Sequence, residues 1–570
     1  MRNQEIAQIF RQIALILEIK GENVFKIRAY VRAAEQLEGL SDPIETFVAA
    51  NRLTDIPGIG KDLSARIAEY CLTGKIALFD ELSQSIPAGL LELLRIPSIG
   101  PKTVQLLYAT LGIDSVAALQ AALDQGKLDG LPGVKEKTIA NIRHGIELLE
   151  RSKERMTLAE ASRVAETFVT ALKKNKFVDS VTCAGSLRRA EDTVGDIDML
   201  VVSAHAQDVM DTFVRLPAVT QVQAHGSTKS SVRIADGTQV DCRVVEVESF
   251  GAALVYFTGS KNFNIKIRHL AIQAGLKVNE YGVFRGEKRI AGKTEKDVFR
   301  ALGLPYIEPE LREDNGEIEA ALSNTLPELV CCNDIRGDLH CHSTWSDGAS
   351  SIAEMALACQ KRGYSYVAIT DHSQSLRVAH GVSVADLKKK KREIDALNKT
   401  VRDFKILFGT EADIDNDGVL DYPDDVLREF DIVVGAIHTG FKQSAEQITR
   451  RLVNACKNKY VHIIAHPTGR LWGVRDAYPM HFEEVCRAAS DTGTALEINA
   501  FPDRLDVNDE LCRMAKKRGV RFSIDTDSHH VEHLQAMRFG VSVARRGWLT
   551  KDDIINTQTL SCLQKELVKK

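Results

Sequence analysis

The second half of this 570-residue chain repeats one pattern, in which a short apolar run ends in histidine or a carboxylate. The first run carries His340 and His342 at alternate positions of a strand, where both side chains face the same way and can hold one metal. A nearby carboxylate and five further strand ends contribute Asp347, His372, Glu411, His438, His466, Asp527 and His529. A lone histidine at a strand end is structural by roughly four to one, but this series predicts a metal cluster.

The alternation of strands and helices predicts where these residues meet. Such a rhythm brings the carboxyl ends of all strands to one rim of a barrel, where barrel active sites lie. The nitrogen and oxygen ligands suit zinc, manganese or iron, and the set lacks the thiolates of a structural zinc site. Cys341 lies between two of the ligands and should point to the opposite face of its strand, into the core. We therefore expect a catalytic metal centre.

This part of the chain resembles the PHP (polymerase and histidinol phosphatase) domain, whose fold is a distorted (βα)7 barrel. That family has nine metal ligands, and the resemblance implies that the nine residues named above are ligands here. It implies two or three bound Mn²⁺, Zn²⁺ or Fe ions and phosphoester hydrolysis, with His340, His342 and His438 as catalytic residues. Two metals about 3.5–4 Å apart can clamp the attacking and leaving oxygens of an in-line displacement.

Length and composition indicate several globular domains. A chain of 570 residues is too long for one core, and its 44% hydrophobic and 27% charged residues are ordinary for a globular protein. No apolar run approaches the ~20 residues that span a bilayer, and the first residues lack a signal-peptide core. Eleven cysteines without a CxxC pair fit a reducing cytosol. The net charge of −4 does not by itself indicate nucleic-acid binding, since acidic metal sites can mask basic faces.

The first ~90 residues are predicted to be helical, and three similar loops follow one another between residues 56 and 138. They read Ile-Pro-Gly-Ile-Gly, Ile-Pro-Ser-Ile-Gly and Leu-Pro-Gly-Val-Lys, and each resembles a helix-hairpin-helix motif. One such loop is as often a plain helix turn, but three copies favour binding to the duplex backbone. Ser98 and Lys135 replace a glycine in the second and third copies, so the first copy is the best phosphate loop. The glycines that would let backbone amides reach a phosphate are Gly58, Gly60, Gly100 and Gly133.

A second set of acidic residues lies between residues 155 and 315. Asp196 and Asp198 stand on one face of an apolar strand, where they would repel each other unless divalent cations lay between them. Asp241 in a later strand offers the third carboxylate, and Gly185 with Ser186 offers a phosphate loop. A surface Asp-x-Asp is usually a solvated turn, but the flanking apolar residues mark a buried strand. Three carboxylates, two Mg²⁺ or Mn²⁺ ions and a phosphate loop predict a nucleotidyl-transfer site.

The segment Tyr256-Phe-Thr-Gly-Ser-Lys-Asn-Phe-Asn264 looks like the nucleotide-contacting segment of X-family DNA polymerases. By this resemblance Asp196, Asp198 and Asp241 are metal ligands, and Asp241 helps to activate the primer 3′-hydroxyl. Lys229 resembles a primer-side contact of the family, and Lys26 a phosphate-binding lysine. The resemblance implies that the incoming nucleotide is bound by Gly185, Ser186, Arg189, Arg155, Tyr256, Phe257, Gly259, Asn264 and Arg268.

Together the resemblances cover almost the whole chain, in the order found in bacterial X-family DNA polymerases. The expected fold is an all-α helix-hairpin-helix region, an α+β nucleotidyltransferase palm with a thumb, and an α/β PHP barrel. The predicted domains are 1–90 (lyase-like DNA-binding helices with the first hairpin), 91–152 (fingers-like helices with two further hairpins), 153–247 (palm), 248–315 (thumb), 316–333 (linker) and 334–570 (PHP metallohydrolase).

The resemblance implies a monomeric bacterial enzyme of the cytoplasm and nucleoid that fills short gaps in base excision repair. Its partners would be gapped or nicked double-stranded DNA and deoxynucleoside triphosphates, with no membrane. The barrel would degrade DNA from the 3′ end, and abasic-site endonuclease or 3′-phosphodiesterase activity would be a further reaction. Three alternatives are a structural barrel, a barrel that hydrolyses a small phosphomonoester, and a DNA-binding scaffold that recruits repair partners.

One residue departs from the family pattern, and one basic run has two interpretations. Animal relatives use a lysine as a Schiff-base nucleophile on a 5′-deoxyribose phosphate, and the aligned residue here is Arg66. Because arginine does not lose its proton, that lyase mechanism is not expected. The densest basic run, Lys388 to Arg392, is interpreted either as a solvated helix face or as a guide for a DNA strand.

Overall fold

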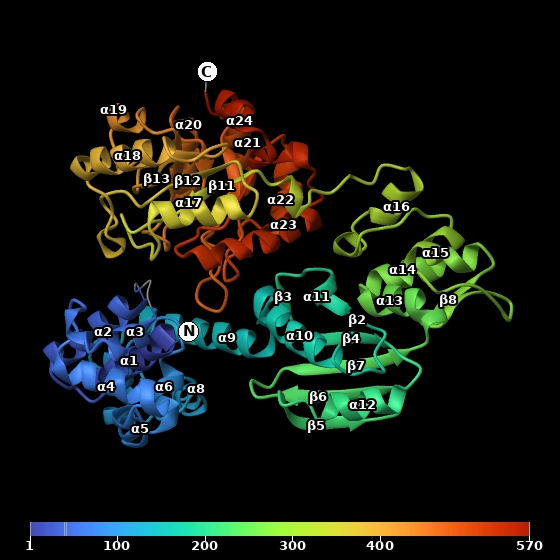
Figure 1. Cartoon of the computed structure of the whole chain (residues 1–570), viewed down its shortest axis with the longest axis horizontal. Helices are drawn as coiled ribbons and strands as arrows, with labels where there is room; N and C mark the ends of the chain where they lie inside the picture. The colour runs from blue at the N-terminus through green and yellow to red at the C-terminus, as the bar shows by residue number, and fades with distance from the viewer. Residues whose placement is uncertain (1, 39, 41–42, 569–570) are drawn as a thin grey trace. The chain divides into compact units, whose positions relative to one another are not determined.

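A computed structural model describes residues 2–38, 40 and 43–568, and these form two compact units. One unit consists of Met1–Lys153 with the short segments Asp347–Ser351 and Leu471–Asp476. The other consists of Glu154–Ser346, Ile352–Arg470 and Ala477–Lys570. The predicted order of an all-α region, an α+β region and a parallel α/β barrel is confirmed (Figure 1).

The first unit is helical because its apolar residues recur at helical spacing. On the first helix Ile6, Ile13 and Leu17 are almost fully buried, and the N-terminal helices pack around them in one hydrophobic cluster. A second cluster gathers the later helices around Leu93, Val104 and other apolar residues. The helices are α1 (Arg2–Ile19), α2 (Val24–Glu38), α3 (Ile44–Ala49), α4 (Lys61–Thr73), α5 (Ala77–Gln84), α6 (Ala88–Leu93), α7 (Pro101–Leu111), α8 (Val116–Asp124) and α9 (Glu136–Glu154).

Among the described residues, no single helix is long and apolar enough to cross a membrane. One pair, α7 with α8, has the length and apolar character only when taken together, and it bends by 67° at its break.

The three hairpin loops share a backbone conformation that explains one of their two glycine positions. Gly58 and Gly133 adopt left-handed conformations, each with φ of +82°, and Ser98 takes the same place in the second loop with φ of +75°. The second position differs, because Gly60 (φ −83°) and Gly100 (φ −100°) have ordinary backbone angles and a Cβ there would meet nothing within 4 Å. The backbone at the first position therefore favours glycine, although Ser98 also adopts it, and the backbone at the second position does not.

Ser98→Gly is expected to stabilise the helical unit by about 0.5–1 kcal/mol. A side chain in the left-handed region costs about 1–2 kcal/mol, and the greater entropy of unfolded glycine offsets part of the gain. Urea unfolding followed by the helical circular dichroism signal measures the change. The matched control is Gly58→Ser, which places serine at the same conformation of the first loop and should destabilise it by a similar amount. A lower stability of Ser98→Gly would contradict this explanation.

The second unit begins with an α+β region built on a five-stranded sheet of order β2-β4-β7-β6-β5. The central strands β4 and β7 are parallel, and the other neighbours are antiparallel. The strands are β2 (Ser180–Cys183), β4 (Asp196–Val202), β5 (Val219–His225), β6 (Lys229–Ile234) and β7 (Gln239–Val245), with the short pair β1 (Met156–Thr157) and β3 (Thr193–Val194). The helices of this region are α10 (Leu158–Leu172), α11 (Gly185–Arg188) and α12 (Ala206–Val214).

The segment predicted as a thumb follows, with its own hydrophobic cluster and a three-stranded antiparallel sheet of order β10-β9-β8. Its elements are α13 (Phe250–Thr258), α14 (Lys261–Gln273), β8 (Lys277–Asn279), β9 (Gly282–Arg285), β10 (Lys288–Ala291), α15 (Glu295–Ala301) and α16 (Glu317–Leu322). Glu295 joins this segment to the palm, because its carboxylate accepts hydrogen bonds from Arg188 (2.6 and 2.8 Å) and from Arg312 (2.7 Å). Burial alone would raise the pKa of Glu295, but the two arginines outweigh it and lower that pKa to about 2.

Glu295→Gln is expected to destabilise this unit by about 3 kcal/mol at pH 7. Since the pKa of Glu295 falls on folding from 4.5 to about 2, its ionised form stabilises the fold above pH 4.5. That contribution is lost as the pH falls through 2, so the penalty of the variant should be full at pH 7 and smaller at pH 4. Thermal unfolding at both values measures it. Glu319→Gln removes an exposed pair with Lys266 and should cost less than about 1 kcal/mol. Equal costs would contradict the assignment.

The C-terminal region is a barrel of seven parallel strands in sequence order, β11 to β17. The ends of this sheet approach each other, since the His342 amide donates to the Ser528 carbonyl at 2.8 Å. The strands are β11 (Gly337–Cys341), β12 (Tyr366–Ile369), β13 (Lys405–Asp413), β14 (Ile432–Ala436), β15 (Ile463–Ile464), β16 (Ala495–Asn499) and β17 (Phe522–Asp525). The helices are α17 (Ile352–Lys361), α18 (Val384–Asn398), α19 (Asp424–Leu427), α20 (Ala445–Lys457), α21 (Phe482–Thr492), α22 (Asp509–Lys517), α23 (Met537–Arg546) and α24 (Leu560–Leu567).

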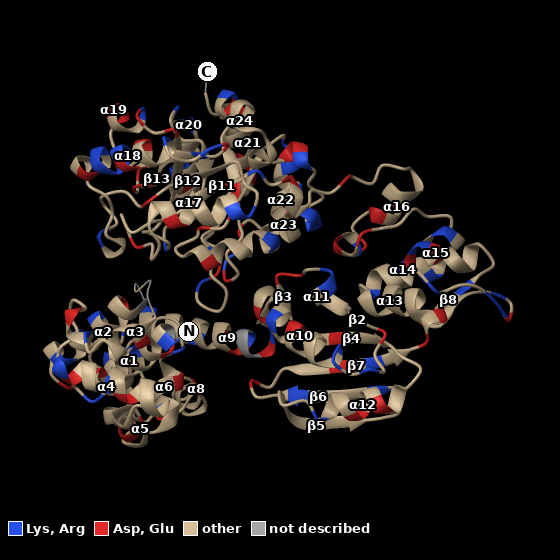
Figure 2. Ribbon diagram, viewed as in Figure 1, with Lys and Arg blue, Asp and Glu red and all other residues tan. Residues whose placement is uncertain are grey.

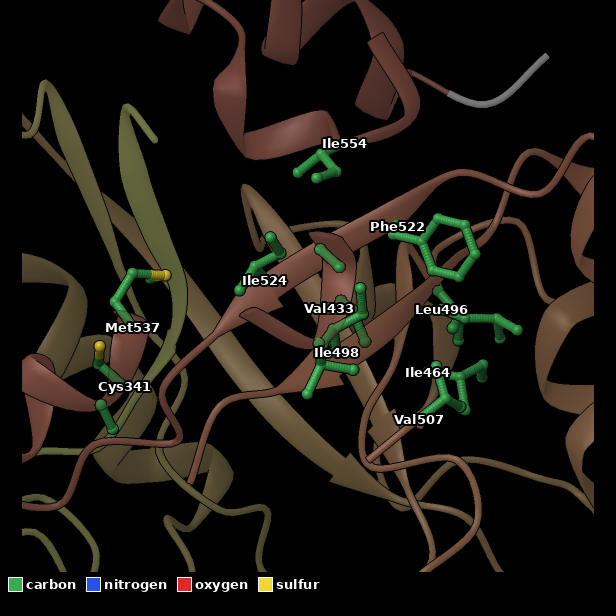
Figure 3. Packing of buried hydrophobic residues seen from close by; sticks show 14 of the residues in the cluster. Cys341, Val433, Ile464, Leu496, Ile498, Val507, Phe522, Ile524, Met537 and Ile554 are labelled. Carbon is green, nitrogen blue, oxygen red and sulfur yellow. The ribbon is translucent and has the colours of Figure 1, made fainter. Parts of the chain in front are cut away.

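Alternate residues of the barrel strands join two different hydrophobic clusters, so the sheet is buried on both faces. On β14, Val433 packs in the larger cluster, whereas Ile432 and Val434 belong to the other. Figure 3 shows part of the larger cluster, in which side chains of β14 to β17 lie together. Cys341 is fully buried in it, as predicted from its place between two histidines.

Candidate metal centres

The carboxyl ends of the barrel strands bring the predicted metal ligands together. His340 lies on β11 and Glu411 on β13, while His438 and His466 each follow the end of their strand by two residues. Three groups of these side chains have ligand atoms within 4.8 Å of one another, and the groups are His340–His342–Asp527, His372–Glu411–His438 and His342–Asp347–His372–His529. Of the nine predicted ligands, only His466 lies outside these groups, and its Nε2 is 3.0 Å from Glu411 Oε1.

Glu411 is the centre of the cluster. Its side chain is fully buried, and its two oxygens lie within 3.6 Å of five imidazole rings. The Oε2 atom faces His340 Nε2 (3.4 Å), His342 Nε2 (3.6 Å) and His372 Nδ1 (2.8 Å), and the Oε1 atom faces His438 Nε2 (3.2 Å) and His466 Nε2 (3.0 Å). A carboxylate surrounded by imidazole nitrogens offers the oxygen and nitrogen donors that divalent metal ions take as ligands.

The chemistry of the cluster fits bound cations. Within the described part of the chain, His340 Nε2 and Glu411 Oε2 are buried without a hydrogen-bond partner, although buried polar atoms are nearly always satisfied. Burial opposes a charge on His340, but Glu497, Asp527 and Glu411 raise its pKa well above the usual value. Burial likewise opposes the charge of Glu411, and the histidines around it lower its pKa well below the usual range. Protons therefore take the place of metal charge, and metal binding would release them.

Further side chains orient the ligands from behind. Glu497 on β16 accepts from His340 through Nδ1 at 2.7 Å and from the His466 amide at 2.6 Å. Asp413 lies 3.3 Å from His438 Nδ1, but the two atoms do not form a hydrogen bond. A partner on Nδ1 fixes the tautomer that presents Nε2 to a metal. Glu497 was not among the residues predicted from the sequence, although a glutamate inside the apolar run Ala-Leu-Glu-Ile-Asn indicates a buried carboxylate.

The basic run of α18 has a buried member, so its interpretation as a solvated helix face is wrong at Lys390. That side chain is fully buried, and its Nζ lies 2.8 Å from Asp371 and donates to the Ile369 and Gly409 carbonyls at 2.9 and 3.0 Å. Asp371 in turn accepts from the Ser343 amide at 2.7 Å. Lys390 therefore ties the end of β12 and the middle of β13 to the loop that follows His342, while Lys388, Lys389 and Arg392 are exposed.

The second candidate centre lies where β4 and β7 run parallel. Asp198 stands directly opposite Asp241 in the register of these strands, and Asp196 lies two residues before Asp198 on the same face. Burial and the two neighbouring carboxylates raise the pKa of Asp198 to about 6. Lys229 Nζ lies 3.6 Å from Asp241, and Gln239 donates to Asp241 at 3.0 Å. Three mutually repelling carboxylates form a site that divalent cations would stabilise.

Gly185 has a close-packing role beside these carboxylates. Its φ is +62°, and a Cβ atom there would lie 2.8 Å from Asp198 Oδ2. The Ala184 amide donates to the Asp198 carbonyl at 2.8 Å, which fixes the predicted phosphate loop against β4. Gly185 and Ser186 form the first turn of α11.

The residues predicted to bind a nucleotide lie around this loop, and their arginines are already paired. Arg189 bonds Glu191, Glu313 (2.8 Å) and the Thr258 carbonyl (2.5 Å), and Arg155 bonds Glu191 (3.2 Å). On the neighbouring helices the remaining predicted contacts lie close together. The Asn264 amide group donates to the Tyr256 carbonyl at 2.7 Å, and Arg268 donates to the Asn264 carbonyl at 3.2 Å. The Phe257 ring lies 4.5 Å from the Arg243 guanidinium. Gly259 ends α13 with φ of +73°.

In the helical unit, the predicted DNA contacts lie at helix starts. Gly60 and Gly100 directly precede α4 and α7, and Gly133 lies three residues before α9. Lys26 on α2 is about half exposed and lies 3.7 Å from Glu22. Arg66 on α4 lies beside Tyr30, where burial raises the pKa of the tyrosine and Arg66 opposes that rise.

Models of four protein domain families match segments of the chain, in the predicted order. Residues 1–76 match a helix-hairpin-helix domain and residues 90–147 a tandem helix-hairpin-helix. Residues 253–313 match the DNA polymerase beta thumb, and residues 338–500 match the PHP domain.

Individual proteins give a fuller match. The DNA polymerase/3′-5′ exonuclease PolX of Bacillus subtilis is 41% identical over 565 residues, which cover 98% of both chains. DNA polymerase lambda of Rattus norvegicus is 27% identical over 343 residues, or 55% of this chain and 56% of that one. A probable phosphatase of Thermoanaerobacter is 30% identical over 232 residues, or 39% of this chain and 89% of that one.

Proposed function

The chain belongs to the bacterial X-family DNA polymerases that carry a C-terminal PHP domain, and we propose from this membership which reaction each metal centre performs. The protein is a DNA polymerase that fills short gaps and a 3′-5′ exonuclease, with DNA and deoxynucleoside triphosphates as substrates. We assign synthesis to the palm carboxylates and degradation to the barrel rim. The observation that carries this assignment is that three carboxylates gather on two palm strands, while eight of the nine predicted barrel ligands form close groups at the rim of a separate fold.

In the palm, Asp196, Asp198 and Asp241 hold two Mg²⁺ or Mn²⁺ ions. When bound, these ions supply charge that neutralises the triphosphate and the developing charge of phosphoryl transfer. Asp241 is held by Gln239 and Lys229, and this support orients its carboxylate to take up the proton of the primer 3′-hydroxyl. The roles proposed for the nucleotide contacts are phosphate binding by Gly185, Ser186, Arg189 and Arg155, sugar contacts by Tyr256, Phe257 and Gly259, and minor-groove contacts by Asn264 and Arg268.

In the barrel, the nine ligands hold two or three Mn²⁺, Zn²⁺ or Fe ions. Bound ions would polarise the scissile phosphodiester and stabilise the leaving 3′ oxygen. Glu411 balances the charge between the histidines, and Glu497 keeps His340 in the tautomer that would bind metal. His340, His342 and His438 are the residues to which we assign catalysis.

We also assign a weak incision of abasic sites to the barrel. Arg66 cannot form the Schiff base used by animal relatives, so this reaction would use the metal centre instead. His340→Ala tests the assignment, because incision of an abasic duplex should disappear with 3′ degradation. Persistence of incision in that variant would contradict it.

A second candidate for the barrel is a small-molecule phosphatase, since probable phosphatases match this region at 30% identity. Hydrolysis of p-nitrophenyl phosphate and degradation of a single strand, compared in the same preparation, separate the two. Hydrolysis of the phosphomonoester without degradation of the strand would favour the phosphatase and leave the barrel without a role at DNA ends.

The hairpin glycines and Lys26 would hold the duplex backbone beside the gap, without reading sequence. Figure 2 shows Lys and Arg interspersed with Asp and Glu over the chain, so binding would depend on local basic groups rather than on net charge. We further propose that the protein acts in base excision repair on gapped or nicked DNA, as a monomer located at the bacterial nucleoid in the cytoplasm. The division into six domains is part of the same proposal.

One assay tests the two-reaction proposal directly. A primer labelled at its 5′ end on one-nucleotide-gapped DNA is incubated with manganese, with and without deoxynucleotides. Extension with nucleotides and shortening without them are the expected results. Extension alone would remove the exonuclease assignment, and shortening alone would remove the polymerase assignment.

A further inference from the structure

A chain of alternating charges runs from the palm, through the end of the thumb, to the barrel helix α23. It links three arginines and three carboxylates. Most of these charged side chains are largely buried, whereas charged side chains usually lie at the surface. The exposed fraction is 11% for Arg189, 18% for Glu313 and 10% for Arg546. In order, the pairs are Arg155–Glu191 (3.2 Å), Glu191–Arg189, Arg189–Glu313 (2.8 Å), Glu313–Arg546 (2.9 Å) and Arg546–Asp509 (2.8 Å).

Arg189 is the member of this chain that lies in the proposed nucleotide site. Its Nη1 donates to the Thr258 carbonyl, and a Cβ atom built on Gly259 would be 3.1 Å from that nitrogen. Its Nε and Nη2 are taken by Glu313 and Glu191. A triphosphate that recruits Arg189 must therefore compete with two carboxylates for the same guanidinium.

Glu313 is shared between the palm and the barrel. Its Oε1 accepts from Arg189 Nε at 2.8 Å and from Arg546 Nη1 at 2.9 Å. Arg546 also donates to the Arg189 carbonyl at 3.0 Å, so it contacts the palm directly. If Arg189 turned to a triphosphate, Glu313 would keep Arg546 as a counterion. Without Arg546 the same step would leave a largely buried carboxylate unpaired, which is strongly unfavourable.

We propose that Glu313 is an exchangeable counterion of the nucleotide-binding Arg189, and that Arg546 of the barrel sets how readily Arg189 is released to a triphosphate. Glu313 and Arg546 are thus positioning residues for nucleotide addition, and helix α23 of the nuclease domain tunes the polymerase site. The inference rests on the proposed role of Arg189 in binding the triphosphate. Because binding linkage is reciprocal, nucleotide in the palm would strengthen the Glu313–Arg546 contact between the two catalytic regions.

The test measures kcat and KM for the incoming deoxynucleotide in single-nucleotide gap filling with the full-length chain. Arg546→Ala is expected to raise KM at least about 5-fold, with a change in kcat of less than about 2-fold. Glu313→Gln in the Arg546→Ala background should return KM to near the wild-type value, because the harmful group is the unpaired carboxylate. Glu313→Gln alone should lower KM, and Arg546→Lys should resemble the wild type.

Arg538→Ala is the matched control, since Arg538 lies on the same helix and pairs with Glu166 of the palm at 3.0 Å, outside the charge chain. It should leave KM unchanged. The inference is overturned if Arg546→Ala leaves KM unchanged, if Arg538→Ala raises it equally, or if Glu313→Gln alone raises it. It is also overturned if Glu313→Gln does not restore KM in the double variant. Failure of the proposed function is distinct, because the wild type would then not fill gaps at all.

Discussion

Glu411→Gln is expected to lower 3′-end degradation at least about 1,000-fold, equivalent to about 4 kcal/mol of transition-state stabilisation. Glutamine has the same size, but it removes the negative charge that faces five imidazole rings within 3.6 Å. Without that charge, the barrel rim has too few carboxylates to balance two or three cations. Bound metal, measured by elemental analysis of dialysed protein, should therefore fall together with the rate of shortening of a 5′-labelled strand.

Gap filling by Glu411→Gln should stay within about 2-fold of the wild type, since the palm carboxylates are unchanged. Glu429→Gln is the matched control, because Glu429 belongs to the same barrel and forms an exposed pair with Lys391. It should retain both metal and degradation. Full degradation by Glu411→Gln would show that this carboxylate does not hold the metals and would remove the centre of the proposed site.

Asp198→Asn should lower gap filling at least about 1,000-fold while 3′ degradation continues. The substitution removes one of three neighbouring carboxylates and with it a proposed ligand of the palm metals. The measurement is extension of a primer on one-nucleotide-gapped DNA, with the barrel inactivated in a second preparation so that shortening does not mask extension. Asp208→Asn on the exposed face of α12 is the control and should extend normally.

The same variant makes a separate prediction about stability. The pKa of Asp198 rises on folding from 3.8 to about 6, so ionisation of this group opposes folding of the metal-free protein. Protonated Asp198 does not oppose folding, so the wild type is destabilised as this group ionises between pH 3.8 and about 6. Asp198→Asn should therefore gain stability over the wild type at pH 7 and little at pH 4. A loss of stability at pH 7 would contradict the proposed repulsion.

Local patterns in the sequence were sufficient to predict the fold classes and to select side chains that gather at the barrel rim. Most of these residues lie at or just after the end of an apolar strand, and parallel strands carry their ends to one rim. Ligand atoms of His340 and Asp527 therefore lie within 4.8 Å of each other although 187 positions separate the two residues. The pairing of Asp198 with Asp241 was predictable for the same reason, because both lie on apolar strands of one sheet. The roles of these residues remain proposals.

Partners that act across long sequence separations could not be predicted. Nothing near Arg189 in the sequence indicates that Glu313 accepts from it, and the same is true of Glu295 and Arg188. The basic run of α18 was misread at one position because helix rotation alone decides which lysine faces the barrel. The left-handed conformation of Ser98 was indicated only by comparison with the other two loops, which have glycine at the same place.

The buried amine of Lys390 has a use that follows from its neighbours. An acylating reagent should modify exposed Lys389 quickly in the native protein and reach Lys390 only when the barrel transiently opens. The ratio of the two labels within one peptide, read by mass spectrometry, would then report the free energy of barrel opening. A cation that binds the rim should slow acylation of Lys390 and leave that of Lys389 unchanged. Comparing cations by this slowing would rank how strongly each binds the rim, without an activity assay.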